Sequence, residues 1–84
     1  MRNIDILKKK ILYRSEHRGT KEMDLLLGNF VKKYVNFLSE NELRELESLL
    51  NTDDEILYKW YLDKDTDKLV PTNNITIKLK DFKL

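Results

Sequence analysis

The residues of this chain with the greatest potential for chemistry lie close together, between positions 13 and 24. Arg18 and Glu22 carry opposite charges, and Gly19, which has no side chain, lies between them. A guanidinium and a carboxylate form charge-assisted hydrogen bonds with a partner, and a neighbouring glycine lets the partner's backbone come close. This spacing is compatible with a docking surface for another protein.

The same stretch also has an ordinary structural explanation, as a junction between two helices. Glycine readily adopts the left-handed conformation that ends a helix, so Gly19 predicts that the first helix stops there. Arg14 and Arg18 then fall in the last turns of that helix, at the carbonyl end of its dipole. Thr20 can cap the next helix with its hydroxyl, and Glu22 lies in the first turn, where carboxylates face unpaired N–H groups. The residue types alone leave both interpretations open.

Catalytic and metal-binding patterns are absent from the sequence. His17, the only histidine, could act as a general base beside Glu16 or Glu22, but a histidine at an exposed helix end is usually only solvated. One histidine and no cysteine predict neither a zinc site nor a disulfide. The sequence also lacks a phosphate-binding glycine loop and a dinucleotide fingerprint. We therefore expect no catalytic residue, no metal, and no cofactor bound stably by the chain itself.

Asp53 and Asp54 are a pair of acids that could suggest acid–base chemistry or a cation site. They follow Thr52 at the start of a predicted helix, where side-chain oxygens accept hydrogen bonds from the first backbone N–H groups. We interpret the pair as part of a helix start. The cap is then provided either by Thr52 together with Glu55, as a capping box, or by Asp54.

The composition describes a small, soluble, globular protein. Its 84 residues suffice for one domain with a single core, and 40% hydrophobic with 37% charged residues fits neither a disordered nor a membrane-spanning chain. A net charge of +1 argues against a general nucleic-acid-binding protein. The first residues predict a charged amphipathic helix and contain no apolar signal core.

Apolar residues recur every three or four positions in five segments, which predicts five helices. The second has the widest apolar face and is expected to be the central core element, with Gly28 marking a close approach to another helix. The last segment alternates like a strand, but a lone strand would have no partner, so we predict a helix. The first two helices are expected over residues 4–18 and 21–38, and the third from a capping box of Ser39 and Glu42 to about Asn51. The fourth is expected to start within residues 52–55, and the fifth covers residues 75–82 after a loop at 63–74.

Two elements of the sequence resemble a known family. Arg18, Gly19 and Glu22 form an Arg-Gly-x-x-Glu motif within the longer string YRSEHRGTKEMDLLLGNF, residues 13–30, and an Asp-Asp-x-x-Leu-x-x-Trp element begins at Asp53. Together they resemble the FAD assembly factors called SdhE in bacteria, which are succinate dehydrogenase assembly factors that promote flavinylation. The resemblance covers nearly the whole chain and implies a small all-α bundle of five helices, in a single domain over residues 1–84.

The resemblance also implies a function. Members of this family bind the flavoprotein subunit of succinate dehydrogenase, and in some bacteria that of fumarate reductase, and promote covalent attachment of FAD to a histidine of that subunit. The attachment chemistry belongs to the flavoprotein, so the factor is not an enzyme and acts on FAD only in its partner. The partner-binding residues implied by the motif positions are Arg14, His17, Arg18, Gly19, Thr20 and Glu22.

Further expectations follow from the family. We expect a protein that is monomeric when free, does not insert into a membrane and does not bind nucleic acid. A mitochondrial member would need a transit segment, so we predict the bacterial cytoplasm. The alternative is a small helical regulatory or antitoxin-like protein that binds another protein or nucleic acid through residues 8–10 and Arg14, for which steeply salt-dependent binding to DNA or RNA would be the sign. A permanent structural subunit is a third possibility, and it predicts a stoichiometric complex.

Overall fold

Five α-helices account for most of residues 3–62 and 70–83, the ranges described by this computed structural model. No residue in these ranges lies in a β-strand, so the all-α prediction is confirmed. The fifth segment is a helix, as predicted, while residues 63–69 of the predicted loop lie outside the described residues. The helices are α1 (Asn3–Glu16), α2 (Lys21–Tyr34), α3 (Glu40–Leu49), α4 (Asp54–Leu62) and α5 (Asn74–Asp81), and a short 3-10 helix, η1 (Val35–Phe37), follows α2.

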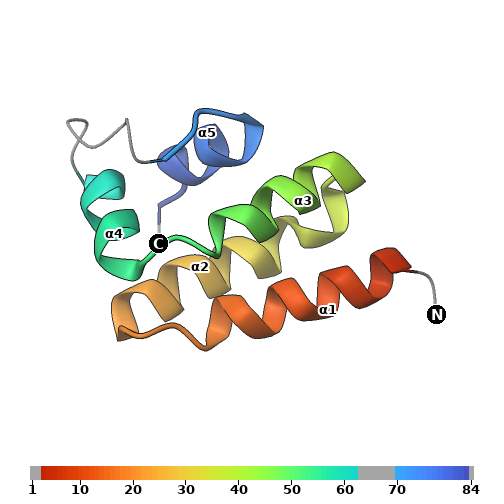
Figure 1. Ribbon diagram of the computed structural model, residues 1–84, viewed down its shortest axis with the longest axis horizontal. Helices are drawn as coiled ribbons and strands as arrows, with labels where there is room; N and C mark the ends of the chain where they lie inside the picture. Colours follow the sequence, from red (N-terminus) through yellow and green to blue (C-terminus); the bar gives the residue numbers. More distant parts are fainter. Residues whose placement is uncertain (1–2, 63–69, 84) are drawn as a thin grey trace.

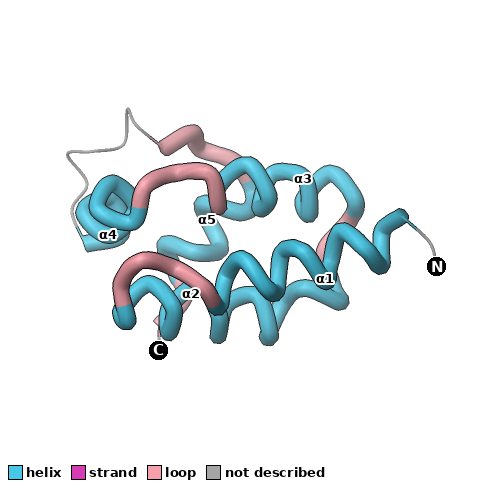
Figure 2. The backbone as a smooth tube through the Cα atoms, turned by 60° about the horizontal axis from the view of Figure 1, so that its bottom comes forward, coloured by secondary structure: helices cyan, strands magenta, loops and turns pink. Residues whose placement is uncertain are grey.

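The first three helices run back and forth along the length of the molecule. In Figure 1, α1 and α2 form an antiparallel pair, and α3 returns above them. Helix α1 packs against both α2 and α3, and α3 also packs against α5. Helix α4 lies at the end of the molecule where α1 passes into α2, as both Figure 1 and Figure 2 show. This arrangement brings the start of α4 next to the α1–α2 junction.

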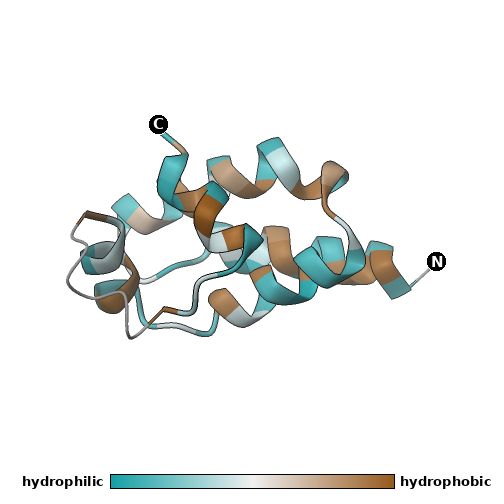
Figure 3. Ribbon diagram, turned by 90° about the horizontal axis from the view of Figure 1, so that it is seen from above, coloured by the Kyte–Doolittle hydropathy of each residue, from teal (hydrophilic) through white to brown (hydrophobic). Residues whose placement is uncertain are grey.

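The core is built mainly around α2, as its wide apolar face predicted. Figure 3 shows that each helix carries both hydrophobic and hydrophilic residues, the pattern of helices with one face in a core. Leu27, Phe30 and Val31 of α2 are fully buried, as are Leu43 and Leu46 of α3. Burial of apolar area is the main force available to a chain this small, which has no cysteine with which to form a disulfide.

Gly28 marks a close approach between α1 and α2, as predicted. A Cβ atom at this position would lie 3.5 Å from the Glu16 side chain and 3.9 Å from the Ser15 carbonyl oxygen. Ser15 is fully buried, and its hydroxyl donates a hydrogen bond to the Leu12 carbonyl at 2.8 Å. The C-terminal turn of α1 therefore packs directly on the middle of α2.

The predicted ends of the first two helices differ from the structure. Helix α1 ends at Glu16 rather than at residue 18, and no glycine within residues 3–62 and 70–83 has a positive φ, so Gly19 does not end the helix by a left-handed turn. The reason is that the Arg18 N–H donates to the Asp24 carboxylate instead of continuing the helix. Helix α2 ends at Tyr34, four residues early, where the chain continues as the 3-10 helix η1, and extended backbone at Leu38 and Ser39 then leads into the cap of α3.

The predicted helix starts agree better with the structure, with one exception. Thr20 caps α2 by accepting from the Met23 N–H at 3.3 Å, and Ser39 and Glu42 form the predicted capping box of α3. Helix α4 begins at Asp54, and the Asp53 carbonyl accepts from the Leu57 N–H, so Asp53 stands at the cap position. Both predicted caps of this helix are therefore wrong. Thr52 lies one residue before the cap position, and the Asp54 carboxylate accepts hydrogen bonds from the α1–α2 junction instead.

Candidate docking surface at the α1–α2 junction

Two connections of the chain meet at one end of the molecule and form a groove. The first is the α1–α2 junction, residues 17–20, and the second is the α3–α4 connection, residues 50–53. The groove has a volume of about 470 Å³, and we call it the junction groove. Its lining comes from both connections and their flanks: Arg14, His17, Arg18, Gly19, Leu50, Asn51, Thr52, Asp53 and Asp54.

Arg18 lines the junction groove, and its guanidinium is directed toward the α3–α4 connection. Its side chain is only 11% exposed. The guanidinium Nε donates to Asp54 Oδ1 at 2.6 Å, Nη1 to the Leu50 carbonyl at 2.6 Å and Nη2 to the Thr52 carbonyl at 2.7 Å. All three of its nitrogens are thus hydrogen-bonded to the α3–α4 connection or to the start of α4. The planar fork of an arginine suits such a set of acceptors better than the single nitrogen of a lysine.

Asp54 is the counterpart of Arg18, and it holds three consecutive residues of the junction. Its side chain is 13% exposed, and Oδ1 accepts from Arg18 Nε. Oδ2 accepts from the backbone N–H of Gly19 at 2.7 Å and of Thr20 at 3.1 Å. Our sequence prediction missed this role, because it treated the carboxylate as a helix cap. The Asp-Asp-x-x-Leu-x-x-Trp element was the signal that could have indicated it.

Gly19 is exposed, and its conformation is not the reason for the glycine. A Cβ atom there would lie 3.2 Å from Asp54 Oδ2, which is tighter than most contacts of real Cβ atoms. The backbone can approach the carboxylate this closely because Gly19 has no side chain. A glycine therefore serves the contact with Asp54 and leaves open surface on the other side.

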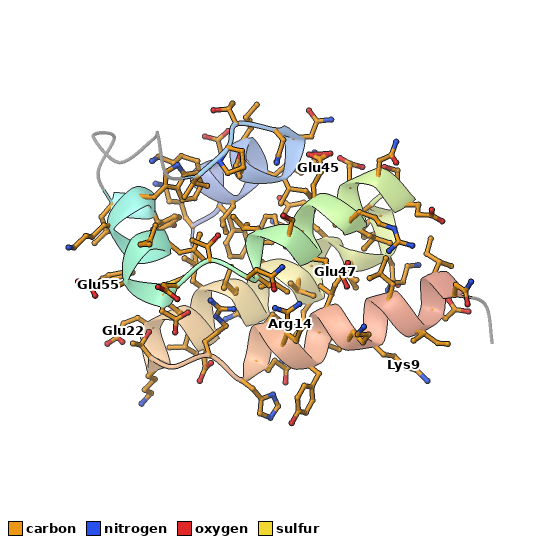
Figure 4. The ribbon with its side chains drawn as sticks, in the orientation of Figure 1. Lys9, Arg14, Glu22, Glu45, Glu47 and Glu55 are labelled. Atoms are coloured by element: carbon orange, nitrogen blue, oxygen red, sulfur yellow. The ribbon has the colours of Figure 1, made fainter. Side chains whose placement is uncertain are left out.

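Arg14, in the last turn of α1, and His17, in the α1–α2 junction, also line the junction groove. Arg14 Nη2 donates to Asn51 Oδ1 at 2.5 Å, and Figure 4 shows this side chain directed from α1 toward the end of α3. His17 is exposed, and its ring stacks on Tyr13 with centroids 4.0 Å apart. His17 Nδ1 lies 2.7 Å from the Tyr13 carbonyl, which can only accept, so Nδ1 carries the hydrogen. The other ring nitrogen is left for solvent or a partner.

Thr20 and Glu22 do not line the junction groove, although both belong to the predicted patch. Both are exposed, and they lie just beyond the groove, at the start of α2. Figure 4 shows Glu22 on the outer side of this end of the molecule, directed away from Arg14. The structure thus brings Arg14, His17, Arg18 and Gly19 together around the groove and places Thr20 and Glu22 beside it. Whether these residues bind a partner stays a prediction.

Within residues 3–62 and 70–83, no group of three or more histidine, aspartate and glutamate side chains could hold a metal ion. None of the helices in this part of the chain has both the length and the apolar character needed to cross a membrane. The geometry of the junction groove is instead that of a preformed polar surface. Two of its backbone N–H groups donate to the Asp54 carboxylate, and two of its backbone carbonyls accept from the Arg18 guanidinium.

Comparison with known proteins identifies the family. A family model described as the flavinator of succinate dehydrogenase matches residues 9–83, which include the whole lining of the junction groove. The chain belongs to this flavinator family. The resemblance stated from the Arg-Gly-x-x-Glu string and the second element is therefore confirmed.

Several curated members of the flavinator family are similar to this chain, and each is called succinate dehydrogenase assembly factor 2, mitochondrial. The Dictyostelium discoideum protein is 43% identical over 61 residues, which are 73% of this chain and 43% of the relative. The Arabidopsis thaliana protein is 41% identical over 56 residues, 67% of this chain and 30% of the relative. The Danio rerio protein is 35% identical over 81 residues, 94% of this chain and 51% of the relative. The chain thus spans only 30% to 51% of the length of these relatives.

One prediction made from the sequence is wrong in the light of these relatives. We expected the bacterial cytoplasm, because the first residues of the chain do not look like a transit segment. The relatives reported above are mitochondrial proteins of eukaryotes.

Proposed function

We propose that this chain is an assembly factor that binds the flavoprotein subunit of succinate dehydrogenase, or of a related fumarate reductase, and promotes covalent attachment of FAD to it. The observation that carries this proposal is the family match over residues 9–83. The relatives named as succinate dehydrogenase assembly factors support the same conclusion. A regulatory or nucleic-acid-binding role is not favoured, because no comparable finding supports it.

The proposed mechanism is one of binding and positioning. The factor binds one domain arrangement of the immature flavoprotein more tightly than the others, so that flavin and the target histidine spend more time in reactive geometry. Bond formation takes place in the flavoprotein. We propose that the factor contributes no catalytic group and holds no FAD by itself.

We propose that the docking surface consists of the rim of the junction groove and the start of α2. Gly19, Thr20 and Glu22 are exposed here, and His17 presents one ring nitrogen. A surface whose backbone is already held in place loses less conformational entropy on binding than a mobile one. The hydrogen bonds that the Gly19 and Thr20 N–H groups donate to Asp54 support this interpretation of the surface.

The test is covalent flavin on the flavoprotein subunit, measured by in-gel flavin fluorescence. The subunit is produced without the factor, with the wild-type factor, with Gly19→Arg, and with Lys78→Ala as a control on exposed α5 surface. We expect fluorescence to rise with the wild-type and Lys78→Ala proteins and to stay at the basal level with Gly19→Arg. Equal fluorescence in all four samples would contradict the proposed function.

A further inference from the structure

Within the Arg-Gly-x-x-Glu motif, Arg18 is the residue whose charge would suit an ion pair with a carboxylate of the partner. In this structure the Arg18 side chain is 11% exposed, and its three nitrogens donate to Asp54, Leu50 and Thr52 at 2.6 to 2.7 Å. Contact with a partner would require breaking bonds that a largely buried guanidinium needs, and removing one member of such a pair is costly. Arg18 is therefore poorly placed to bind another protein.

We propose that Arg18 serves partner binding as a positioning residue, and that it acts through the carboxylate of Asp54 rather than by contact with the partner. This inference rests on the proposed function. We call the pair the Arg18–Asp54 bridge. The bridge fixes the α1–α2 junction against the start of α4, and through Asp54 Oδ2 it fixes the backbone of Gly19 and Thr20.

The chemistry of the bridge depends on a carboxylate at position 54. One oxygen accepts from the guanidinium and the other accepts from two backbone N–H groups. An asparagine has the same shape but only one acceptor oxygen, and its amide nitrogen is a donor. Whichever way the amide is turned, its nitrogen faces either Arg18 or the N–H groups of Gly19 and Thr20. Asp54→Asn therefore breaks one half of the bridge without removing side-chain volume.

The exposed amides of the junction depend on Asp54. Residues 17–20 lie between two helices, and Gly19 and Thr20 are exposed. Within the described part of the chain, the other hydrogen bonds of the junction include that of the Arg18 N–H to the Asp24 carboxylate. The hydroxyl and the carbonyl of Thr20 also accept from the N–H groups of Met23 and Asp24. None of these bonds uses the Gly19 or Thr20 N–H, so loss of the bridge is expected to loosen the exposed turn.

A double-mutant cycle on binding distinguishes positioning from contact. Affinity for the flavoprotein subunit is measured for wild type, Arg18→Lys, Asp54→Asn and the double variant. Lysine keeps the charge but has one nitrogen, so it cannot reach Asp54, Leu50 and Thr52 together. We expect each single variant to bind at least about tenfold more weakly than wild type. The double variant is expected to bind no more weakly than the weaker single variant, because both changes break the same bridge.

Two further measurements guard against loss of the fold. Circular dichroism at the temperature of the binding assay must show wild-type helix content, and Asp81→Asn, which changes an exposed carboxylate on α5 outside the junction groove, must bind like wild type. In ¹H–¹⁵N correlation spectra of the free protein, Asp54→Asn and Arg18→Lys are both expected to shift the Gly19 and Thr20 amides, while core amides such as that of Phe30 stay in place. If a variant fails to keep its helix content, these amide shifts in the more conservative Asp54→Asn variant decide the question.

The outcomes separate this inference from the proposed function. Affinity factors that multiply in the double variant would show that Arg18 contacts the partner independently, and would overturn the inference alone. Unchanged Gly19 and Thr20 amides in Asp54→Asn would also overturn it. A wild-type protein with no affinity for the flavoprotein subunit would overturn the proposed function and the inference together.

Discussion

The backbone N–H of Gly19 donates a hydrogen bond of 2.7 Å to the carboxylate of Asp54, a residue 35 positions further along the chain. This bond links the α1–α2 junction to the first residue of α4. It also explains why a glycine stands at the exposed turn although its backbone is not left-handed, since a Cβ would lie 3.2 Å from the accepting oxygen. Substitutions at Gly19 can therefore separate an effect on the proposed docking surface from an effect on the stability of the fold.

Gly19→Arg is expected to abolish binding to the flavoprotein subunit and to leave the bundle folded. Gly19 is exposed, so the long side chain can extend into solvent, where it would stand between the proposed docking surface and its partner. Gly19→Ala is the matched control, because its methyl group needs only a small shift of the Asp54 side chain. We expect Gly19→Ala to keep most of the flavinylation activity and Gly19→Arg to lose it.

The measurements for Gly19 are circular dichroism and flavin fluorescence of the flavoprotein subunit. Both variants should keep wild-type helix content, with a melting temperature lowered by several degrees, as expected for a loss of about 1 kcal/mol in a domain of this size. Loss of helical signal in Gly19→Arg would show that the residue is needed for folding, and the docking interpretation of this position would then fail.

Gly28→Ala is expected to stabilise the protein. Glycine inside a helix costs about 1 kcal/mol relative to alanine, and a Cβ here would make ordinary contacts of 3.5 and 3.9 Å with α1. Thermal unfolding should show a melting temperature about 4 to 8 °C higher than wild type, if the full propensity gain is realised. Gly28→Leu is the contrast, since its larger side chain would run into Ser15 and Glu16 and lower the melting temperature. A lower melting temperature for Gly28→Ala would mean that the two helices cannot accept even a methyl group.

Removal of the Ser39 hydroxyl is expected to cost stability without affecting binding. Ser39 and Glu42 exchange two hydrogen bonds at the start of α3, and loss of such a cap typically costs about 1 kcal/mol. Ser39→Ala should therefore lower the free energy of unfolding in urea, and Ser48→Ala, at an exposed position of the same helix, should not. Affinity for the flavoprotein subunit should be the same in both. Weaker binding by a folded Ser39→Ala protein would mean that the docking surface also includes the start of α3.

The fold was largely predictable from the sequence because each helix has a recognisable pattern within a short stretch of residues. The spacing of apolar residues and the capping residues can both be recognised within a few positions of the sequence. The structure confirms the predicted caps Thr20 and Ser39. Of the six predicted partner-binding residues, Arg14, His17, Arg18 and Gly19 lie around one groove, while their role in binding stays a prediction. Local patterns could not predict which side chains from distant parts of the sequence form hydrogen bonds with each other. Asp54 has the usual features of a helix-capping residue, and only the packing of α4 beside the junction turns its carboxylate toward Arg18 and Gly19.

Glu22→Ala is expected to reduce flavinylation far more than it reduces stability. The carboxylate is exposed in the first turn of α2, where its interaction with the helix dipole contributes about 0.3–1 kcal/mol. Glu55→Ala is a matched control, because Glu55 is an exposed acid in the first turn of α4 and pairs with Lys59 at 3.3 Å. Figure 4 shows both glutamates at the same end of the molecule. The two variants should have similar melting temperatures, and flavin fluorescence of the flavoprotein subunit should fall only with Glu22→Ala. If both variants supported full flavinylation, Glu22 would have no role beyond the start of its helix, and the docking surface would be confined to the junction groove.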